Sequence, residues 1–312
     1  QVIKVTDSDG PTLACPANLT VSTDPFLCCG SPNLPDIVVE DACSRIDSAN
    51  ARIVVRDPVT NQITATYDLK GSMQDFPGNN HWEPDTLAVF GNTPCLPLGA
   101  HTVTYKLTDN CGNTSTCTFR LTMDDGTPPV VACDEFTQVS LGINGEVFVN
   151  ATTFDDGSYD NCSQVYFKAR RMSSNSCQSS SQFHDQVKFC CSDINDTITV
   201  VLRVYEVEVQ AGSVSTTFQE QNANDCMVQV FVDDKLKPTC IPPANVTVSC
   251  ENFDPSLWAY GFATSNDNCC VDTITVTTNY SLFDTLCSKG TITRTFRAFD
   301  CGGLSNQCTQ RV

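Results

Sequence analysis

Two stretches inside the chain follow the same order of features: an alternating strand, an acidic turn, a proline and a cysteine. They are residues 117–133, CTFRLTMDDGTPPVVAC, and residues 226–240, CMVQVFVDDKLKPTC. Short alternating runs bounded by Asp, Gly and Pro are typical of strands that end in a turn. Each stretch therefore predicts the last strand of one domain, a linker, and the first cysteine of the next domain.

The two ends of the sequence resemble the two halves of such a stretch. Residues 1–15, QVIKVTDSDGPTLAC, match the second half, and residues 308–312, CTQRV, match the first half. Counting from the cysteines aligns Val312 with Leu121 and Val5 with Met123, so the ends overlap by a few residues. We therefore expect copies of the chain to join head to tail. The predicted polymerisation strand comprises Val2, Ile3, Val5, Cys308, Gln310 and Val312.

Three further signals recur and set the domain boundaries. An opening signal is found at 15–21 and 240–248, a middle signal ends at Cys43, Cys162 and Cys269, and a closing signal is found at 99–117 and 290–308. We predict an N-terminal donor strand and linker (1–14), a first domain with a long insertion (15–125), a second domain (126–235), and a third domain with an incomplete last strand (236–312).

Hydrophobic residues alternate with a period of two. Val103, Tyr105 and Leu107 alternate with threonine and lysine, and the run from Ile198 to Val204 does the same. Short β-branched runs separated by turn residues predict sandwiches, and no segment carries a helical stripe. The expected fold is all-β: three tandem immunoglobulin-like β-sandwich domains, rich in disulfides, with helix limited to a turn or two near 254–258.

Composition narrows the compartment and the partners. The chain has 20 Cys in 312 residues, a density typical of secreted proteins, and a formal net charge of -18. Nucleic-acid binding needs a basic surface, so we expect no nucleic-acid partner. The apolar runs are too short to span a membrane.

The cysteines predict structural disulfides rather than a metal centre. Zinc sites favour Cys-x-x-Cys spacing with histidine partners, but no such spacing occurs and the three histidines are scattered. We expect all cysteines, or all but two, to be oxidised. Each adjacent pair (28–29, 190–191 and 269–270) should send its sulfurs to different partners. The first and third domains hold seven cysteines each, so each leaves a thiol free or forms a bridge across a boundary.

The acidic linkers could bind calcium, an ion that takes six to eight oxygen ligands. Clustered Asp at linkers is one way to supply them, and an ordinary solvated turn is the alternative. The candidate calcium ligands are Asp7, Asp9, Asp124, Asp125, Asp233 and Asp234.

No catalytic constellation is found in the sequence. A Ser-His-Asp site has little support, and nothing marks a cleft for paired carboxylates. Trp82 is either a sugar-stacking platform or, more often in such loops, packed beneath its own loop. Covalent glycans are expected, and the Asn-x-Ser/Thr candidates are Asn18, Asn113, Asn150, Asn161, Asn195, Asn245 and Asn279.

The closing strand at 99–105, the turn at 108–113, Cys117 and the linker at 124–133 together resemble the hyalin repeat (HYR) and related immunoglobulin-like modules. The second domain and the segment 241–248 resemble long multi-repeat surface proteins of Bacteroidota, commonly exported by the type IX route. That resemblance implies a stalk, adhesin or matrix role. It also implies O-glycans at Asp-Ser/Thr sites, which match Ser48, Thr86, Thr197, Thr273 and Thr285.

The sequence thus favours a non-enzymatic structural subunit of an extracellular bacterial filament, assembled from copies of itself by β-strand complementation. The alternative is a fragment of a carbohydrate- or cell-binding adhesin stalk from a longer tandem-repeat protein. A secreted hydrolase would need a catalytic domain that this sequence does not contain.

Overall fold

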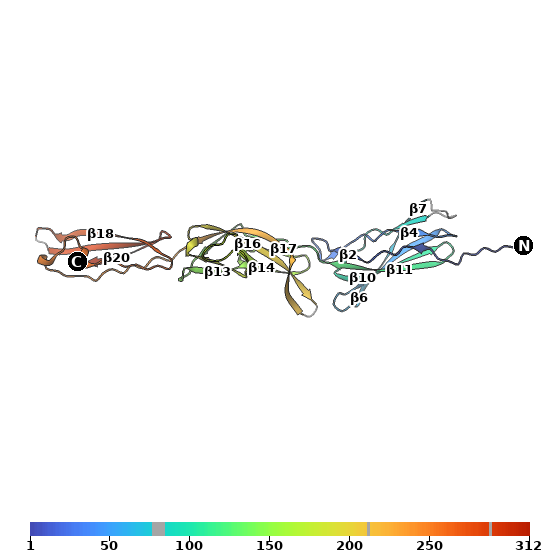
Figure 1. Ribbon diagram of the computed structural model, residues 1–312, viewed down its shortest axis with the longest axis horizontal. Coiled ribbons are helices and arrows are strands. Elements are labelled where there is room, and N and C mark those ends of the chain that lie inside the picture. The colour runs from blue at the N-terminus through green and yellow to red at the C-terminus, as the bar shows by residue number, and fades with distance from the viewer. Residues whose placement is uncertain (77–84, 211–212, 287–288) are drawn as a thin grey trace. The chain divides into compact units, whose positions relative to one another are not determined.

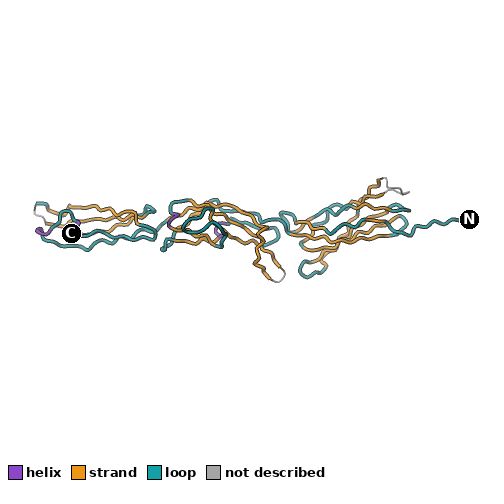
Figure 2. Tube along the Cα trace, viewed as in Figure 1, coloured by secondary structure: helices purple, strands orange, loops and turns teal. Residues whose placement is uncertain are grey.

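The computed structural model describes residues 1–76, 85–210, 213–286 and 289–312, so Trp82 and Cys287 lie outside the described residues. The contacts divide the chain into two units. Unit 1 comprises 1–129, 159–165 and 205–223, and unit 2 comprises 130–158, 166–204 and 224–312. In both units the described residues form strands and loops with only single turns of helix, as Figures 1 and 2 show.

Residues 12–124 form three sheets. One contains β1-β4-β8-β7, a second contains β2-β11-β10-β5-β6, and a small third sheet pairs β3 with β9. The strands are β1 (Thr12–Leu13), β2 (Leu19–Ser22), β3 (Cys29–Gly30), β4 (Ile37–Glu40), β5 (Ile46–Arg56), β6 (Ile63–Lys70), β7 (Ser72–Phe76), β8 (Asp85–Val89), β9 (Leu96–Pro97), β10 (Gly99–Asp109) and β11 (Thr114–Asp124).

The core of these sheets follows from the alternation in β10 and β11. Val103, Tyr105 and Leu107 point inward from β10, and Phe119 and Leu121 point inward from β11. Gly112 makes the tight turn between the two strands at a φ of 89°, a conformation that favours glycine. The Tyr105 ring stacks on Phe90, and its hydroxyl donates to the Pro35 carbonyl, so this buried polar group is satisfied.

Residues 136–233 form a second set of sheets, β12-β17-β16-β14 and β13-β15. The elements are β12 (Phe136–Ser140), β13 (Glu146–Asn150), β14 (Gln164–Arg171), β15 (Gln186–Cys190), β16 (Thr197–Gln210), β17 (Ser213–Asp233), and the 3₁₀ turns η1 (Ala151–Phe154) and η2 (Cys191–Asp193). Val200, Leu202 and Val204 of β16 are fully buried, as their alternation predicts.

Residues 271–311 form the antiparallel sheet β18-β19-β20, preceded by irregular chain. The elements are β18 (Val271–Asp284), β19 (Lys289–Asp300), β20 (Ser305–Arg311), η3 (Cys250–Asn252) and η4 (Trp258–Tyr260). A small core gathers Leu257, Tyr260 and Ile292, with Val248 and Val312 packed against it.

The all-β, disulfide-rich fold that the sequence predicts is confirmed. The 3₁₀ turn at Trp258–Tyr260 lies close to the segment expected to be helical. Among the described residues, no helix is long and apolar enough to cross a membrane.

Candidate assembly groove and carboxylate clusters

The first and third sheet regions share one local arrangement, which lets their positions be compared directly. The Arg120 amide donates to Oδ1 of Asn18 at 2.9 Å, and the Arg311 amide donates to Oδ1 of Asn245 at 2.8 Å. Each arginine lies in the strand that follows the same closing signal. Asn18 therefore corresponds to Asn245, and Leu121, the residue after Arg120, corresponds to Val312.

This correspondence shows what covers the apolar edge of the first region. There β11 continues beyond Leu121, and Met123 pairs with Val21 of β2 on one side and Gly99 of β10 on the other. Met123 is buried. In the second region Val232 of β17 occupies the same register against Val139 of β12.

The corresponding edge of the third region is a groove of about 450 Å³. Val248 and Gly290 occupy the positions of Val21 and Gly99, and Gly290, like Gly99, has a positive φ. The groove is lined by Val246, Val248, Cys250, Phe253, Phe283, Thr291, Ile292 and Val312, among others. Its apolar floor is therefore built from the core of the third region.

The N-terminal segment presents apolar side chains to solvent. Val2, Ile3 and Val5 are 97%, 80% and 88% exposed, and no strand pairing involves residues 1–11 among the described residues. Figure 1 shows this segment, marked N, extending away from the sheets of unit 1. Three branched aliphatic side chains in one short exposed segment favour burial against another surface.

The remaining predicted polymerisation residues form their bonds within the third sheet region. Cys308 is bonded to Cys240. Gln310 is fully buried, donates to the Ala244 and Tyr260 carbonyls and accepts from Arg294 at 2.8 Å. Val312 exchanges two backbone hydrogen bonds with Ile292 and ends the floor of the groove.

A first carboxylate cluster lies within unit 1 and joins Asp125, Asp160 and Glu206. One oxygen from each lies within 4.8 Å of the others. Asp160 is held by its Oδ2 atom, which accepts the amides of Cys162 and Ser163, both at 2.8 Å. Its Oδ1 atom has no hydrogen-bond partner among the described residues, and the same is true of one side-chain oxygen each of Asp125 and Asn161.

A second group of carboxylates lies within unit 2 and repeats the turn of the first cluster. Asn268 donates to Asp234 at 3.3 Å, but the three carboxylates are not among the described sets whose oxygens all lie within 4.8 Å of one another. Asp267 accepts the amides of Cys269 and Cys270 through Oδ2, and its Oδ1 atom has no partner among the described residues. One carboxylate oxygen of Asp234, one of Asp300 and the amide oxygen of Asn268 likewise have no hydrogen-bond partner among the described residues.

A third cluster joins Asp7, Asp41 and Asp109, again with one oxygen each within 4.8 Å. Asp41 accepts the Cys43 and Ser44 amides as Asp160 and Asp267 accept theirs. Asp7 therefore stands where Asp125 and Asp234 stand in the other clusters, directly after the residues that form a closing strand there.

The predicted calcium ligands thus separate into two groups. Asp7, Asp125 and Asp234 enter the clusters. Asp9 donates its amide to Asp7, the Asp124 side chain accepts the Asp125 amide, and Asp233 contacts Gln138 and Lys235. Sequence reasoning considered Asp160 but did not identify the other carboxylates that meet these aspartates, which are Asp41, Glu206, Asp267, Asp109 and Asp300. The Asp-x-Cys repeat was a usable signal, but it had been interpreted only as a domain marker.

Eight disulfides join sixteen of the cysteines, and three of the described cysteines (Cys43, Cys111 and Cys250) have free thiols. The three free thiols exceed the two that the sequence analysis allowed. Cys43 is equivalent to Cys162 and Cys269, and both of these are bonded. Disulfides at this density form in oxidising, extracellular compartments.

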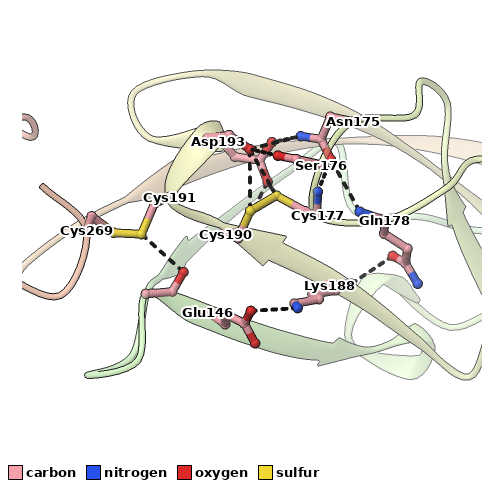
Figure 3. Close-up of a disulfide and its surroundings, with 12 residues drawn as sticks. Glu146, Asn175, Ser176, Cys177, Gln178, Lys188, Cys190, Cys191, Asp193 and Cys269 are labelled. Atoms are coloured by element: carbon pink, nitrogen blue, oxygen red, sulfur yellow. Dashed lines mark hydrogen bonds and ion pairs between the residues drawn. A yellow bond between two sulfur atoms is a disulfide. The ribbon is translucent and has the colours of Figure 1, made fainter.

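Each adjacent cysteine pair bonds in two directions, as predicted. In Figure 3, Cys190 reaches Cys177 whereas Cys191 reaches Cys269. The Cys28–Cys162 bridge behaves similarly, since the neighbouring Cys29 bonds Cys95. Cys28–Cys162 and Cys191–Cys269 both cross predicted domain boundaries, and each ends on the cysteine of an Asp-Asn-Cys motif. The equivalent cysteine of the first motif is Cys43.

The glycan candidates differ in accessibility. Thr86 is 2% exposed and donates to Asp75, so a glycan there would require local unfolding. The Asn161 amide nitrogen donates to Thr23, Asp24 and Leu27, which engages the atom that a glycan would need. Asn113 and Ser48 are half-buried, and the other candidates are exposed: Asn18, Asn150, Asn195, Asn245, Asn279, Thr197, Thr273 and Thr285.

Comparison with known proteins supports the fold. Residues 89–123 match the HYR domain. The match covers the closing hairpin β10–β11, where the sequence resemblance was placed, and supports an immunoglobulin-like repeat family. A comparison with curated proteins gives no match.

Two solved structures similar to the chain are those of human CDH23 and titin. Human CDH23 repeats EC21–23 share 12% identity at a TM-score of 0.39, covering 96% of this chain and 100% of that one. Titin domains I67–I69 share 11% identity at a TM-score of 0.36, covering 97% and 98%.

Proposed function

We propose that the protein is a structural subunit of an extracellular filament, in which residues 1–6 of one copy lie in the groove at Val248 and Gly290 of the next copy. The observation that carries the proposal is the equivalent position of three aspartates. Asp7 and Asp125 occupy the same place in two carboxylate clusters, and Asp234 lies in the corresponding group of unit 2. The residues before Asp125 and Asp234 form closing strands, so residues 1–6 are suited to the same role.

The register fixes which side chains enter the groove. Setting Asp7 on Asp125 places Val5 on Met123 and Ile3 on Leu121, as counting from the cysteines also does. Val5 would then pair with Gly290 and Val248, covering the apolar floor, while Lys4 and Thr6 face outward. Ile3 falls on the position of Val312, so residues 1–3 would lie beside β20 rather than continue it.

Two forces would hold the donated segment. An extended backbone can pair with the exposed edges of both neighbouring segments, as β-augmentation does in other proteins. Burial of Val5 and Ile3 would contribute roughly 1.5–3 kcal/mol each before ordering costs. The alternative occupant is the continuation of the chain itself in a longer stalk, and the experiments below separate the two.

A charge at the buried position tests the proposal against a matched control. We expect Val5→Asp to weaken head-to-tail association by at least about tenfold, because the carboxylate would replace a buried aliphatic side chain. Thr6→Asp adds the same charge at a position where the equivalent residues are Asp124 and Asp233. It should leave association unchanged. Sedimentation velocity measures both, and equal loss in the two variants would contradict the register.

The free thiols give a second prediction. Thr23 lies two residues after Val21, and it accepts a hydrogen bond from Asn161, the residue before Cys162. Cys250 lies two residues after Val248 and therefore corresponds to Thr23. Cys250 of the copy that carries the groove would therefore lie near Cys43 of the copy that donates residues 1–6. We expect these two thiols to form a disulfide in the assembled state, passing two electrons and two protons to a small-molecule or protein disulfide.

Denaturing electrophoresis without reductant checks this bond. Assembled protein should give a ladder of covalent multimers, and Cys43→Ser and Cys250→Ser should each collapse it to monomer. Cys111→Ser removes the third free thiol of the described residues and should leave the ladder intact. A ladder that depends on Cys111, or monomer from assembled wild-type protein, would contradict the predicted pairing.

A further inference from the structure

Two groups of buried oxygen atoms have no hydrogen-bond partner among the described residues. In unit 2 these atoms belong to Asp234, Asp267, Asn268 and Asp300, and in unit 1 to Asp125, Asp160 and Asn161. Buried polar atoms in folded proteins are nearly always hydrogen-bonded, so four such oxygens in one cluster require a physical explanation. A solvated turn, the ordinary alternative for clustered Asp, does not leave its carboxylate oxygens buried.

Burial is deepest in unit 2. Asp234 and Asp300 are only 2% and 3% exposed. Carboxylates buried together away from water are unfavourable as anions unless one takes up a proton or a cation neutralises them. A bound cation would in addition engage the oxygens that have no partner among the described residues.

The other oxygen of each carboxylate is fixed by the protein. Asp234 accepts the Leu236 amide at 3.0 Å, Asp267 accepts two amides of its own turn, and Asp300 accepts the Leu304 amide at 2.7 Å. Asn268 donates its amide nitrogen to the Gly142 carbonyl, which leaves its oxygen free of donors among the described residues. Each ligand group is thus oriented by one atom while the other atom is unengaged.

The cluster in unit 1 has the same plan with a glutamate in the third place. Asn161 donates through nitrogen and keeps its oxygen unengaged, as Asn268 does. Glu206 is buried, and both of its oxygens accept hydrogen bonds, one from Ser163 and one from Asn222. This cluster therefore offers three unengaged oxygens, one fewer than the group in unit 2.

We propose that each of these two clusters binds one calcium ion, through three carboxylates and the side-chain oxygen of an asparagine. An all-oxygen set that mixes carboxylates with a neutral amide oxygen is typical of calcium, whereas zinc and copper favour nitrogen or sulfur. The formal charge of three carboxylates offsets the ion with one negative charge to spare. Bound calcium would tie a linker aspartate to a turn and to a strand within each unit.

The third cluster is left out of the proposal. Asp109 accepts from the backbone and side-chain nitrogens of Asn113 through both of its oxygens, and Ala42 stands where the other clusters have asparagine. The third cluster therefore has no unengaged oxygen at the positions of Asp300 and Asn268. Neither of the two proposed sites depends on assembly, so the proposal stands or fails separately from the filament.

Calorimetric titration of chelator-treated full-length protein with calcium chloride tests the proposal. We expect two calcium ions per chain. Asp125→Asn and Asp300→Asn each keep the hydrogen-bonded oxygen and replace the unengaged one with an amide group. Each should remove one binding event or weaken it by at least about tenfold, because calcium affinity follows the number of charged ligands. Asp68→Asn, at an exposed carboxylate paired with Arg52, should change nothing.

Thermal unfolding guards against a trivial loss of folding. In chelator, both variants should unfold at the same temperature as the parent or higher, because one repelling charge is gone. In calcium the parent should gain more stability than either variant. Equal unfolding temperatures of the parent in calcium and chelator, or calcium binding that both variants retain in full, would overturn the proposal.

Discussion

Removal of residues 1–6 should leave folded protein that no longer polymerises. Residues 1–11 take part in no sheet among the described residues, so the deletion removes exposed chain rather than core. The loss should be complete, because Val5, Ile3 and the whole donated backbone disappear together. Electron microscopy and sedimentation velocity should show monomers, while circular dichroism should show an unchanged β spectrum.

A synthetic peptide of residues 1–9 provides the complementary control. Added in excess to intact chain, it should cap the groove and shorten the polymers, whereas the same peptide carrying Val5→Asp should not. Polymers of normal length from the truncated chain would rule out strand donation. They would favour the stalk alternative, in which the groove holds another part of a longer protein.

Loss of the Arg171 side chain should strongly destabilise the second sheet region. Arg171 and Asp193 form a two-armed ion pair with bonds of 2.9 and 2.7 Å, and both side chains are 1% exposed. Removing one partner leaves the other charge buried and uncompensated, which costs about 3–5 kcal/mol. Arg171→Met and Asp193→Ala should both fall in this range.

Hydrogen exchange followed by mass spectrometry can localise that loss to β14, β15 and β16. Arg52→Gln is the matched control, because its ion pair with Asp68 is mostly exposed and should contribute about 0–1 kcal/mol. A small effect at Arg171, equal to that at Arg52, would show that the buried pair contributes little to the fold.

The same pair gives a pH dependence. Burial opposes ionisation of Asp193, but hydrogen bonds from Arg171, the Cys190 amide and Asn175, together with the Arg171 charge, outweigh it and hold its pKa below the ordinary value. The stabilisation is therefore fully present above the unfolded pKa of about 3.9 and is lost as the pH falls below it through the folded pKa. Denaturation of this region should steepen below about pH 4, and Asp193→Asn should flatten that dependence.

Particular residues show why the fold was more predictable than the sites. Strand alternation placed Val103, Tyr105 and Leu107 in the core, because side-chain direction in a strand depends only on local geometry. The separate partners of adjacent cysteines followed from the same rule. The carboxylate clusters did not, because Asp125, Asp160 and Glu206 are brought together only by sheet register over long sequence separations.

The groove shows a mixed outcome. Residue counting aligned Val312 with Leu121, as the equivalent hydrogen bonds of Asn18 and Asn245 also do, since repeats preserve spacing. The match of Val5 to the position of Met123 stays a prediction. Counting could not show that Gln310 is fully buried with Arg294 inside its own sheet region, or that Cys250 lies at the rim of the groove. Those placements depend on the irregular chain at 241–264, which carries no periodic signal.

A cryo-electron microscopy map of assembled native protein tests strand donation most directly. The account predicts density for residues 1–6 of one subunit in the groove of the next, with Val5 between Val248 and Gly290 and a bond joining Cys250 to the neighbouring subunit's Cys43. A map in which residues 1–6 pair only within their own subunit, or in which the groove is filled by chain that continues beyond Val312, would contradict it.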